Sequence, residues 1–453
     1  MQGMETQTGE FKTALPKRLT PSQEGKLASV GSGALDTLAA FTNRSLTCSH
    51  CKRCTLRCEV LKDPNMDIGE INRVYRRITG LPEGDQVAAI IQEMTARPEL
   101  YHALRRCCFC GYCTAECRAH QFAPEVMRGW RELFSRAGYM PPNDSRMVMV
   151  DDEWHIFSAY RAIYGIGYPE FRSLADAAAE GPGVADTVLF PGCSLVSYTP
   201  DLVRAVGNWM NQQGFAWALS QDCCGSPLMS AGLFDRAEGL RLRIVEQLRA
   251  AGVKRLITVC PGCGEELADT MPEDIDIIPL PELLFDATRE AASPAQAGFS
   301  PLDPAPASYT VFDSCHDRRD NRHGLAIRRL LQKYLPQAER REMDNRRKQT
   351  LCCGAGGAVA GYDDDITARR IAEVLREGRT TGAETLVSMC PTCSYTIAQA
   401  SLGEIAMGGI PLASHHYLEL LFGIETDWAA IFGRLEGMWT GEYGPWLTET
   451  FFS

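Results

Sequence analysis

The chain has 453 residues, a formal net charge of -11 and no conspicuous run of Lys or Arg, so it is not expected to bind nucleic acid. Hydrophobic residues make up 45% of the chain, which at this length predicts two to four domains. The sequence has no apolar run of the roughly 20 residues that span a membrane and no stretch resembling a signal peptide. We expect a cytoplasmic protein, with peripheral attachment to the inner face of the cell membrane as an alternative.

The 19 cysteines are the most informative part of the composition. Their number is odd, the chain is long, and they fall into tight groups. Disulfide frameworks are instead typical of short secreted domains. We therefore interpret the groups as thiolate ligands of metal in a reducing compartment.

The first part of the chain is expected to be an arm followed by a helical unit. Residues 1–45 lack sustained periodicity and are interpreted as an N-terminal arm. Residues 46–150 carry nine cysteines and helical patterning. A connector at 151–183 ends in Gly181-Pro182-Gly183, a turn-forming sequence.

Two similar domains and a tail are expected in the rest of the chain. The domains span 184–295 and 309–425 and are joined by a linker at 296–308. The tail at 426–453 is rich in aromatic residues. It is expected either to pack on the second domain or to anchor a partner protein.

Two groups in the first half share the spacing C-x2-C-x2-C-x3-C, at residues 46–58 and 107–117. Three cysteines of such a motif hold one cubane 4Fe–4S cluster, and the fourth usually ligates the other cluster. Zinc would instead favour CxxC pairs, commonly with His. The spacing therefore predicts two cubane clusters, one held by Cys48, Cys51, Cys54 and Cys117, the other by Cys58, Cys107, Cys110 and Cys113.

The helical spacer between these groups resembles the α-helical ferredoxin fold found in the iron–sulfur subunits of succinate dehydrogenases. The Pro that commonly follows the fourth cysteine in bacterial ferredoxins is replaced by Glu59 and Arg118. Cys108 is left over and is interpreted as a small buried apolar residue.

A five-cysteine unit occurs twice, at 193–263 and 315–393, in the order Cys, Cys-Cys-Gly, Cys-Pro-x-Cys. Five thiolates exceed the four that a cube needs, so one thiolate could bridge two irons. The glycines after the cysteine pairs, Gly225 and Gly354, would let the backbone approach a cofactor closely. The ten cysteines are Cys193, Cys223, Cys224, Cys260 and Cys263, and Cys315, Cys352, Cys353, Cys390 and Cys393.

Predicted strands and helices alternate through both copies, and cysteines follow the strand ends, where α/β sheets bind ligands. The fold class predicted is α/β, with an N-terminal α-helical ferredoxin module followed by two duplicated Rossmann-like βαβ domains. The expected strands are Thr187–Pro191, Phe215–Leu219 and Arg255–Val259, then Tyr309–Phe312 and Thr385–Met389.

The five-cysteine order resembles the cysteine-rich CCG domain of heterodisulfide reductases, and the likeness covers roughly residues 46–425. A ferredoxin module ahead of two such domains is the arrangement of the D-type subunits of these reductases. The resemblance implies that each set of five holds a noncubane 4Fe–4S cluster and acts in reducing, or reversibly forming, a disulfide or heterodisulfide. It thus makes the ten cysteines both metal ligands and catalytic residues, beside Gly225 and Gly354.

Relatives with the same layout leave a second function open. They include the K-type iron–sulfur protein of the sulfite-reduction-associated membrane complex and the C-type iron–sulfur protein of anaerobic glycerol-3-phosphate dehydrogenase. The alternative is therefore a pure electron-transfer component of a membrane-associated respiratory complex. The sequence has no nucleotide fingerprint, so under either function electrons come from a partner: a membrane cytochrome b, a multihaem cytochrome or a flavin protein. The first function adds a disulfide-type substrate, either a small molecule or a small protein.

Polar residues beside the cysteines keep two interpretations each. His316 could donate protons to a product thiolate, or bond to its own loop. Arg318 and Arg319 could attract an anionic substrate or form a solvated basic turn. The pair His415-His416 has no matching ligands nearby and is assigned to the core or the surface.

Overall fold

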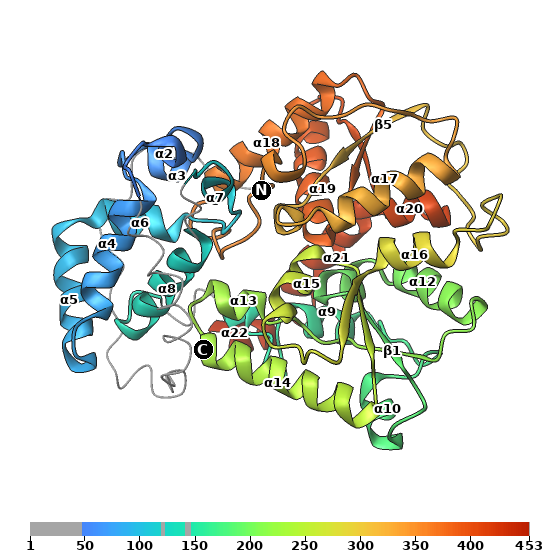
Figure 1. The fold of residues 1–453 in the computed structure, drawn as a ribbon, viewed down its shortest axis with the longest axis horizontal. Helices are drawn as coiled ribbons and strands as arrows, with labels where there is room; N and C mark the ends of the chain where they lie inside the picture. Colours follow the sequence, from blue (N-terminus) through green and yellow to red (C-terminus); the bar gives the residue numbers. More distant parts are fainter. Residues whose placement is uncertain (1–47, 119–122, 141–145, 453) are drawn as a thin grey trace.

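The computed structural model describes residues 48–118, 123–140 and 146–452. The arm expected at residues 1–45 lies outside these ranges. An all-helical unit lies beside two units that each contain a sheet (Figure 1). Within the described ranges, no helix combines the length and the apolar character needed to cross a membrane.

Residues 48–140, here called the helical module, contain only helices and loops in the part that the structure describes. Helix α8 lies at its centre, where Trp130 and Phe134 are fully buried against Tyr75 and Tyr101. The helices are α2 (Arg53–Arg57), α3 (Glu59–Lys62), α4 (Ile68–Thr79), α5 (Glu83–Ala96), α6 (Pro98–Arg105), α7 (Tyr112–Ala115) and α8 (Ala123–Arg136).

The first copy of the repeat contains a four-stranded parallel sheet in the order β2-β1-β3-β4. Strand β1 is wholly buried, which explains why three of its four residues are apolar. The elements are β1 (Thr187–Phe190), α11 (Cys193–Tyr198), α12 (Pro200–Gln212), β2 (Trp217–Leu219), α13 (Ser226–Ser230), α14 (Phe234–Ala251), β3 (Arg255–Thr258), α15 (Pro261–Ala268), β4 (Asp276–Pro279) and α16 (Leu280–Ala287). Before them come η3 (Arg146–Val148), α9 (Ile156–Ile163) and α10 (Leu174–Glu180).

The second copy repeats this topology, with the strand order β6-β5-β7-β8 and parallel pairing throughout. Two similar parallel sheets with helical crossovers confirm the α/β class predicted from the sequence. The elements are β5 (Ser308–Phe312), η4 (Cys315–Asp317), α17 (Arg322–Tyr334), β6 (Glu339–Arg340), η5 (Arg347–Gln349), α18 (Asp364–Thr380), β7 (Thr385–Ser388), α19 (Pro391–Ala406), β8 (Ala413–His416) and α20 (Tyr417–Phe422).

The sequence pattern does not predict three edge strands, β4 in the first sheet and β6 and β8 in the second. Strand β4 follows α15 and pairs with β3, while β8 follows α19 and pairs with β7. Both are only partly buried, so neither shows the apolar run of a central strand. Pro279 ends β4 and His415-His416 ends β8, which weakens the strand signal further.

One apolar core joins the two copies. Trp209 of α12 and Phe299 belong to the same buried cluster as Tyr334 of α17 and Leu418 of α20. Helices α16 and α17 lie side by side where the copies meet (Figure 1). This shared core fixes the two sheets relative to each other.

The aromatic tail forms α21 (Trp428–Thr440) and α22 (Gly444–Phe452). It packs on the connector, where Leu447 and Phe451 share a buried cluster with Tyr160 of α9, and on α19 of the second copy. Contact with the second copy runs through Tyr395 of α19, whose ring lies 4.9 Å from that of Phe432. The expectation that the tail packs on the second domain is therefore right only in part.

Candidate metal centres

The repeat cysteines lie in loops after the parallel strands and in the first turns of the following helices. Cys193 follows β1, and Cys260 follows β3 as the residue before α15. In the second copy Cys315 follows β5, and Cys390 precedes α19. The carboxyl ends of parallel strands share one edge of a sheet, so each set of five gathers at that edge.

Sulfur atoms of the first set are in mutual contact. The Sγ atoms of Cys193 and Cys223 are 3.7 Å apart. Contacts with Cys223 and then Cys263 hold the pKa of the Cys224 thiol well below its usual value. Cys263 also contacts Cys260, so these contacts link all five thiols.

The second set is arranged similarly. The Sγ atoms of Cys353 and Cys393 are 3.3 Å apart, and Cys352 contacts Cys315 and Cys353. Cys393 in turn contacts Cys390. Sulfur contacts therefore link all five thiols of this set too.

The two sets meet each other at one point. The Sγ atoms of Cys260 and Cys390 lie 3.9 Å apart, although 130 residues separate them in the chain. These are the residues before α15 and α19, at equivalent places in the two copies. The repeat thus produces one composite thiol-rich site, which the sequence alone does not predict.

The second set also meets the helical module. Cys352 lies within sulfur hydrogen-bonding reach of both Cys108 and Cys110. Cys108 is 2% exposed, as expected for a buried residue, but its thiol also donates a hydrogen bond to the Gly354 carbonyl, at 3.5 Å. It therefore lies in an interface between units and not inside one core.

Cysteines of the helical module gather in two neighbouring places. The Cys113 thiol interacts electrostatically with the thiols of Cys58, Cys107 and Cys54. A cavity of about 180 Å³ lies beside it. The cysteines that line this cavity are Cys48, Cys51, Cys54, Cys113 and Cys117.

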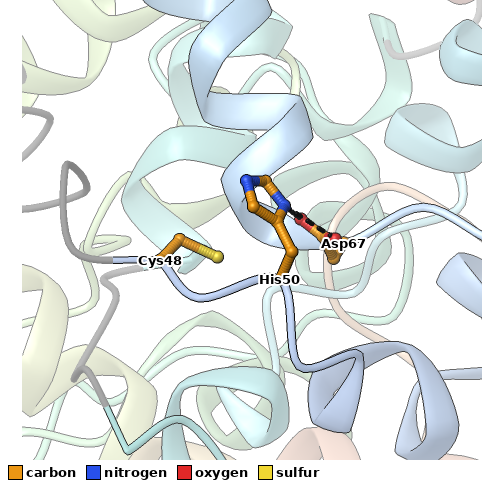
Figure 2. A group of neighbouring side chains, drawn as sticks. All are labelled: Cys48, His50 and Asp67. Carbon is orange, nitrogen blue, oxygen red and sulfur yellow. Dashed lines mark hydrogen bonds and ion pairs between the residues drawn. The ribbon is translucent and has the colours of Figure 1, made fainter.

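A mixed group at this cavity is not evident from the sequence. Cys48, His50 and Asp67 offer a sulfur, a ring nitrogen and a carboxylate oxygen that all lie within 4.8 Å of one another (Figure 2). His50 Nδ1 is 3.0 Å from Asp67, whose carboxylate also accepts the Glu70 N–H at the start of α4. Asp67 is the N-cap residue of α4, and this role explains the presence of a carboxylate here. The Asp67 side chain also orients His50 beside Cys48.

Four glycines permit close packing around the cysteines. Gly225 and Gly354 have φ values of 82° and 84°, which glycine tolerates best. A Cβ at Gly354 would lie 2.8 Å from the backbone of Thr367, so this glycine admits α18. A Cβ at Gly192 would lie 2.9 Å from Cys263 Sγ, and one at Gly69 would lie 2.3 Å from Cys48 Sγ, so these two glycines, which the sequence did not single out, directly face cysteine sulfurs.

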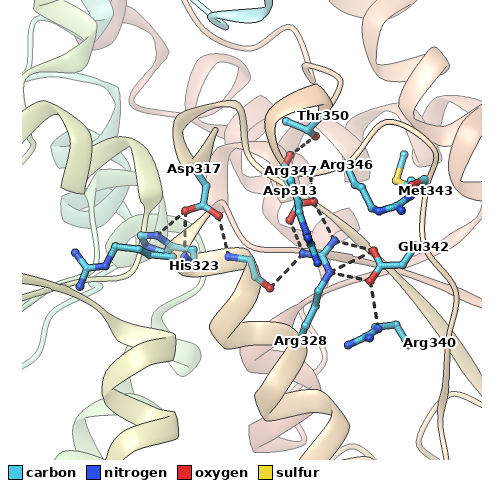
Figure 3. A network of polar contacts seen from close by, with 12 residues as sticks. Asp313, Asp317, His323, Arg328, Arg340, Glu342, Met343, Arg346, Arg347 and Thr350 are labelled. Carbon is cyan, nitrogen blue, oxygen red and sulfur yellow. Dashed lines mark hydrogen bonds and ion pairs between the residues drawn. The ribbon is translucent and has the colours of Figure 1, made fainter. Parts of the chain in front are cut away.

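A polar network holds the loops that carry the second set (Figure 3). The Asp313 carboxylate after β5 binds the Arg328 guanidinium, with the closer contact at 2.6 Å. It also accepts the Arg347 N–H, and its own carbonyl accepts the Thr350 hydroxyl. These bonds tie the loop before Cys315 to the loop before Cys352.

His316 lies between the two copies. Its Nδ1 bonds to the Glu265 carboxylate of α15, and its ring lies against Gly262. Burial by itself lowers the pKa of His316, but the Glu265 charge outweighs it and raises the pKa to about 9. His316 is therefore protonated at neutral pH, and it bonds to the other copy and not to its own loop.

The structure corrects both expectations for Arg318. This side chain is 8% exposed, so it is neither a solvated turn nor free to attract an anion. Its guanidinium donates to the carbonyls of Cys110, Lys348 and Thr350. Arg319 is exposed.

His416 is a structural residue, in line with its assignment to the core. Its Nδ1 accepts the Leu418 N–H at the start of α20, and its Nε2 contacts the Met389 carbonyl at 3.3 Å. His415 lies partly buried on β8 beside it.

The chemistry of the donor sets fits anionic iron–sulfur clusters. Arg131 is 0% exposed, yet it forms no ion pair with a carboxylate in the described residues. All five of its N–H groups can be satisfied by carbonyls, one of them that of Cys107. A buried cation normally needs a compensating anion, and a thiolate-ligated cluster held by Cys107 would supply negative charge at this place.

Comparison with known proteins agrees with the duplicated cysteine-rich architecture. The family model described as "CCG: Cysteine-rich domain" matches residues 187–268 and 309–398. The chain is 26% identical over 394 residues to the B-type subunit of "Fumarate reductase (CoM/CoB)" from Methanothermobacter marburgensis, covering 84% of this chain and 72% of that protein.

Two further relatives extend this likeness. The chain is 26% identical over 306 residues to the D-type subunit of "Dihydromethanophenazine:CoB--CoM heterodisulfide reductase" from Methanosarcina barkeri, covering 64% of this chain and 71% of that protein. It is 27% identical over 242 residues to the C-type subunit of "Anaerobic glycerol-3-phosphate dehydrogenase" from Escherichia coli K12, covering 51% and 59%. The chain therefore carries two CCG cysteine-rich domains and is an iron–sulfur oxidoreductase component related to these subunits of heterodisulfide reductase and glycerol-3-phosphate dehydrogenase.

Proposed function

We propose that this protein passes electrons through two cubane 4Fe–4S clusters to two noncubane 4Fe–4S clusters, which reduce a disulfide-type substrate. The observation that supports it best is the chain of thiol contacts between units. Cys110 of the helical module contacts Cys352 of the second set, and Cys390 of that set lies 3.9 Å from Cys260 of the first. Iron–sulfur clusters at these places would be close enough together to exchange electrons.

The ligand assignment of the proposal follows the sequence. The helical module would be a ferredoxin-type module within 46–150, and the Rossmann-like CCG domains would span 184–295 and 309–425. Cys48, Cys51, Cys54 and Cys117 would hold one cubane cluster, and Cys58, Cys107, Cys110 and Cys113 the other. Each complete set of five would hold one noncubane cluster: Cys193, Cys223, Cys224, Cys260 and Cys263, and Cys315, Cys352, Cys353, Cys390 and Cys393.

The reaction needs two electrons and two protons. The S–S bond breaks, each sulfur receives one electron and one proton, and two thiols leave. The clusters would supply the electrons, and they would also provide iron sites that have an affinity for sulfur. The electrons come from a partner redox protein, at the inner face of a membrane if that partner is a cytochrome b.

The chain's own residues would handle the protons. His316 is protonated at neutral pH and lies beside the contact between the two sets. Its bond to Glu265 fixes the ring and leaves Nε2 as the atom that could give a proton to a departing thiolate. Proton return would pass through the same ring.

Iron analysis of the anaerobically purified chain gives the first test. Four clusters predict about 16 irons per chain, four for each cluster. Cys352→Ala is expected to lose about four irons, because it removes a ligand of one cluster. Cys108→Ala, a buried cysteine 3.5 Å from the Gly354 carbonyl oxygen, is the matched control and should keep them all.

Activity gives the second test. With reduced methyl viologen as donor, the chain should reduce a disulfide from a panel including oxidised glutathione and cystine, and thiols should change the EPR spectrum of its clusters. Full iron content with no EPR response to any thiol or disulfide would contradict disulfide reduction.

The other candidate is a pure electron-transfer function. The likeness to the anaerobic glycerol-3-phosphate dehydrogenase protein favours it. This function predicts clusters that the viologen reduces and a haem or flavin partner reoxidises, without any effect of disulfides. The same reconstituted chain thus separates the two candidates.

A further inference from the structure

One arginine of the second CCG domain lies where that domain meets the helical module. Arg370 is on the second turn of α18, and its Nη1 is 3.8 Å from Cys110 Sγ. Its other near thiols are Cys108, Cys352 and Cys58. A single guanidinium therefore lies among sulfurs from two different cysteine sets.

The position of Arg370 is fixed by its helix. Thr367 Oγ1 donates to the Gly354 carbonyl at 3.2 Å, which holds α18 against the Cys-Cys-Gly loop. Ile366 is fully buried in an apolar cluster with Val60 and Ala103 of the helical module. Figure 1 shows α18 on the side of the second sheet unit that faces this module. These contacts hold the partly buried Arg370 side chain beside the helical module, where its charge acts on the thiols at close range.

No carboxylate neutralises Arg370 in the described residues. The next residue, Arg369, is 51% exposed in its side chain and pairs with Glu59. The pair thus offers two adjacent arginines, one engaged in a surface ion pair and one directed at thiols.

The equivalent region of the first copy differs in charge. Arg241 of α14 donates to the Cys224 carbonyl, but its guanidinium also binds the buried Glu266 carboxylate at 2.8 Å. Glu266 accepts from Arg128 as well. The two copies therefore repeat the cysteines without repeating the electrostatics.

We propose that Arg370 is a positioning residue that raises the reduction potentials of two clusters at once, the cubane cluster of Cys58, Cys107, Cys110 and Cys113 and the cluster of the second CCG set. The inference rests on the proposed function, because it needs clusters at both places. A reduced cluster is more negative than an oxidised one, so a nearby unneutralised cation stabilises the reduced form.

An EPR-monitored redox titration of the full chain tests this. Cluster signals are assigned by their loss in Cys113→Ala and Cys353→Ala. In Arg370→Gln, the one-electron equilibrium of both junction clusters should shift at least tenfold toward the oxidised form, about 59 mV lower in potential. Arg370→Lys keeps the charge and should keep most of the potential, and Arg369→Gln should change nothing.

The outcomes separate the inference from the proposed function. A wild-type chain without iron would refute the proposed function. Full iron content with unchanged potentials in Arg370→Gln would overturn the inference alone. The inference also fails if Arg370→Lys shifts the potentials as far as Arg370→Gln does, or if Arg370→Gln loses iron, since Arg370 would then serve cluster retention.

Discussion

Glu266 shows at the scale of single residues how the units are joined by buried charge. Its side chain is 1% exposed and accepts from Arg128 of the helical module and Arg241 of its own domain. Burying a carboxylate is costly unless hydrogen bonds and opposite charge compensate it, and two guanidinium groups do so here. The same rule makes the buried Arg131 and Arg318 and the partly buried Arg370 informative, because none of the three has a carboxylate partner in the described part of the chain.

At this scale, the helix cap formed by His155 predicts that the stability of the chain depends on pH. Its Nδ1 accepts the Ser158 N–H and caps α9, a role open only to the neutral ring. Burial, with the Arg161 charge second, lowers the pKa of His155 to about 4. The unfolded chain has the ordinary value of about 6.5, so it binds protons more readily than the folded chain as the pH falls.

The contribution of His155 to the free energy of unfolding should therefore be fully present above a pH of about 6.5. It should fall by up to about 3 kcal/mol as the pH is lowered toward 4. Urea unfolding at several pH values, wild type against His155→Asn, measures it. Asn also caps helices but does not titrate, so the variant should lose this part of the pH dependence. Equal pH dependence in both proteins would contradict the assignment.

At the scale of elements, helices α21 and α22 pack against each other and against the connector segment that contains η3 and α9. Leu447 is 0% exposed, and Trp446 meets Trp154 edge to face with ring centroids 5.0 Å apart. Most aromatic side chains of the tail thus pack against other residues of the same chain. Phe452, 51% exposed, keeps an outward-facing surface.

Leu447→Ala should lower the unfolding free energy by about 2–5 kcal/mol, because it opens a cavity in a packed cluster. Tyr443→Ala is the control, because Tyr443 lies on the same tail and is 40% exposed. This variant should lower the unfolding free energy by much less than Leu447→Ala does. Thermal melting followed by circular dichroism compares the two variants. Similar melting temperatures would mean that the tail does not stabilise the fold.

At the scale of the whole molecule, Arg131 connects the three units. Its guanidinium donates to Leu104, Arg105 and Cys107 of the helical module, to Ser230 of the first CCG domain and to Gly357 of the second. Burial lowers the pKa of this guanidinium to about 9, so holding the charge here has a real cost. The bonds make the arrangement of the three units depend on one side chain.

Arg131→Met should therefore destabilise the chain by about 3 kcal/mol or more, since it leaves several buried carbonyls without donors. Arg204→Met, which removes a surface ion pair with Glu170, should cost at most about 1 kcal/mol. Urea unfolding followed by tryptophan fluorescence measures both. A smaller loss in Arg131→Met than in Arg204→Met would show that the units are joined by other contacts.

Local sequence determined much of the architecture. Short segments with a β-branched and apolar centre, such as Thr187–Phe190 and Thr385–Ser388, favour buried parallel strands, and the repeated cysteine order sets the domain type. Edge strands β4 and β8 escaped prediction because half-buried strands have weak apolar patterns. The odd cysteine, Cys108, could be predicted as buried but not placed between units.

Only the tertiary structure decided which cysteine sets touch. Cys110 reaches Cys352, and Cys260 reaches Cys390, across 242 and 130 residues of chain. Spacing along a chain constrains residues a few positions apart, whereas these contacts depend on how whole units pack. The same holds for charge: the two copies share their cysteines, but Arg241 beside the first set binds the Glu266 carboxylate, whereas Arg370 binds no carboxylate among the described residues. Sequence thus predicted the candidate ligands, and packing decided which of them meet and which charges surround them.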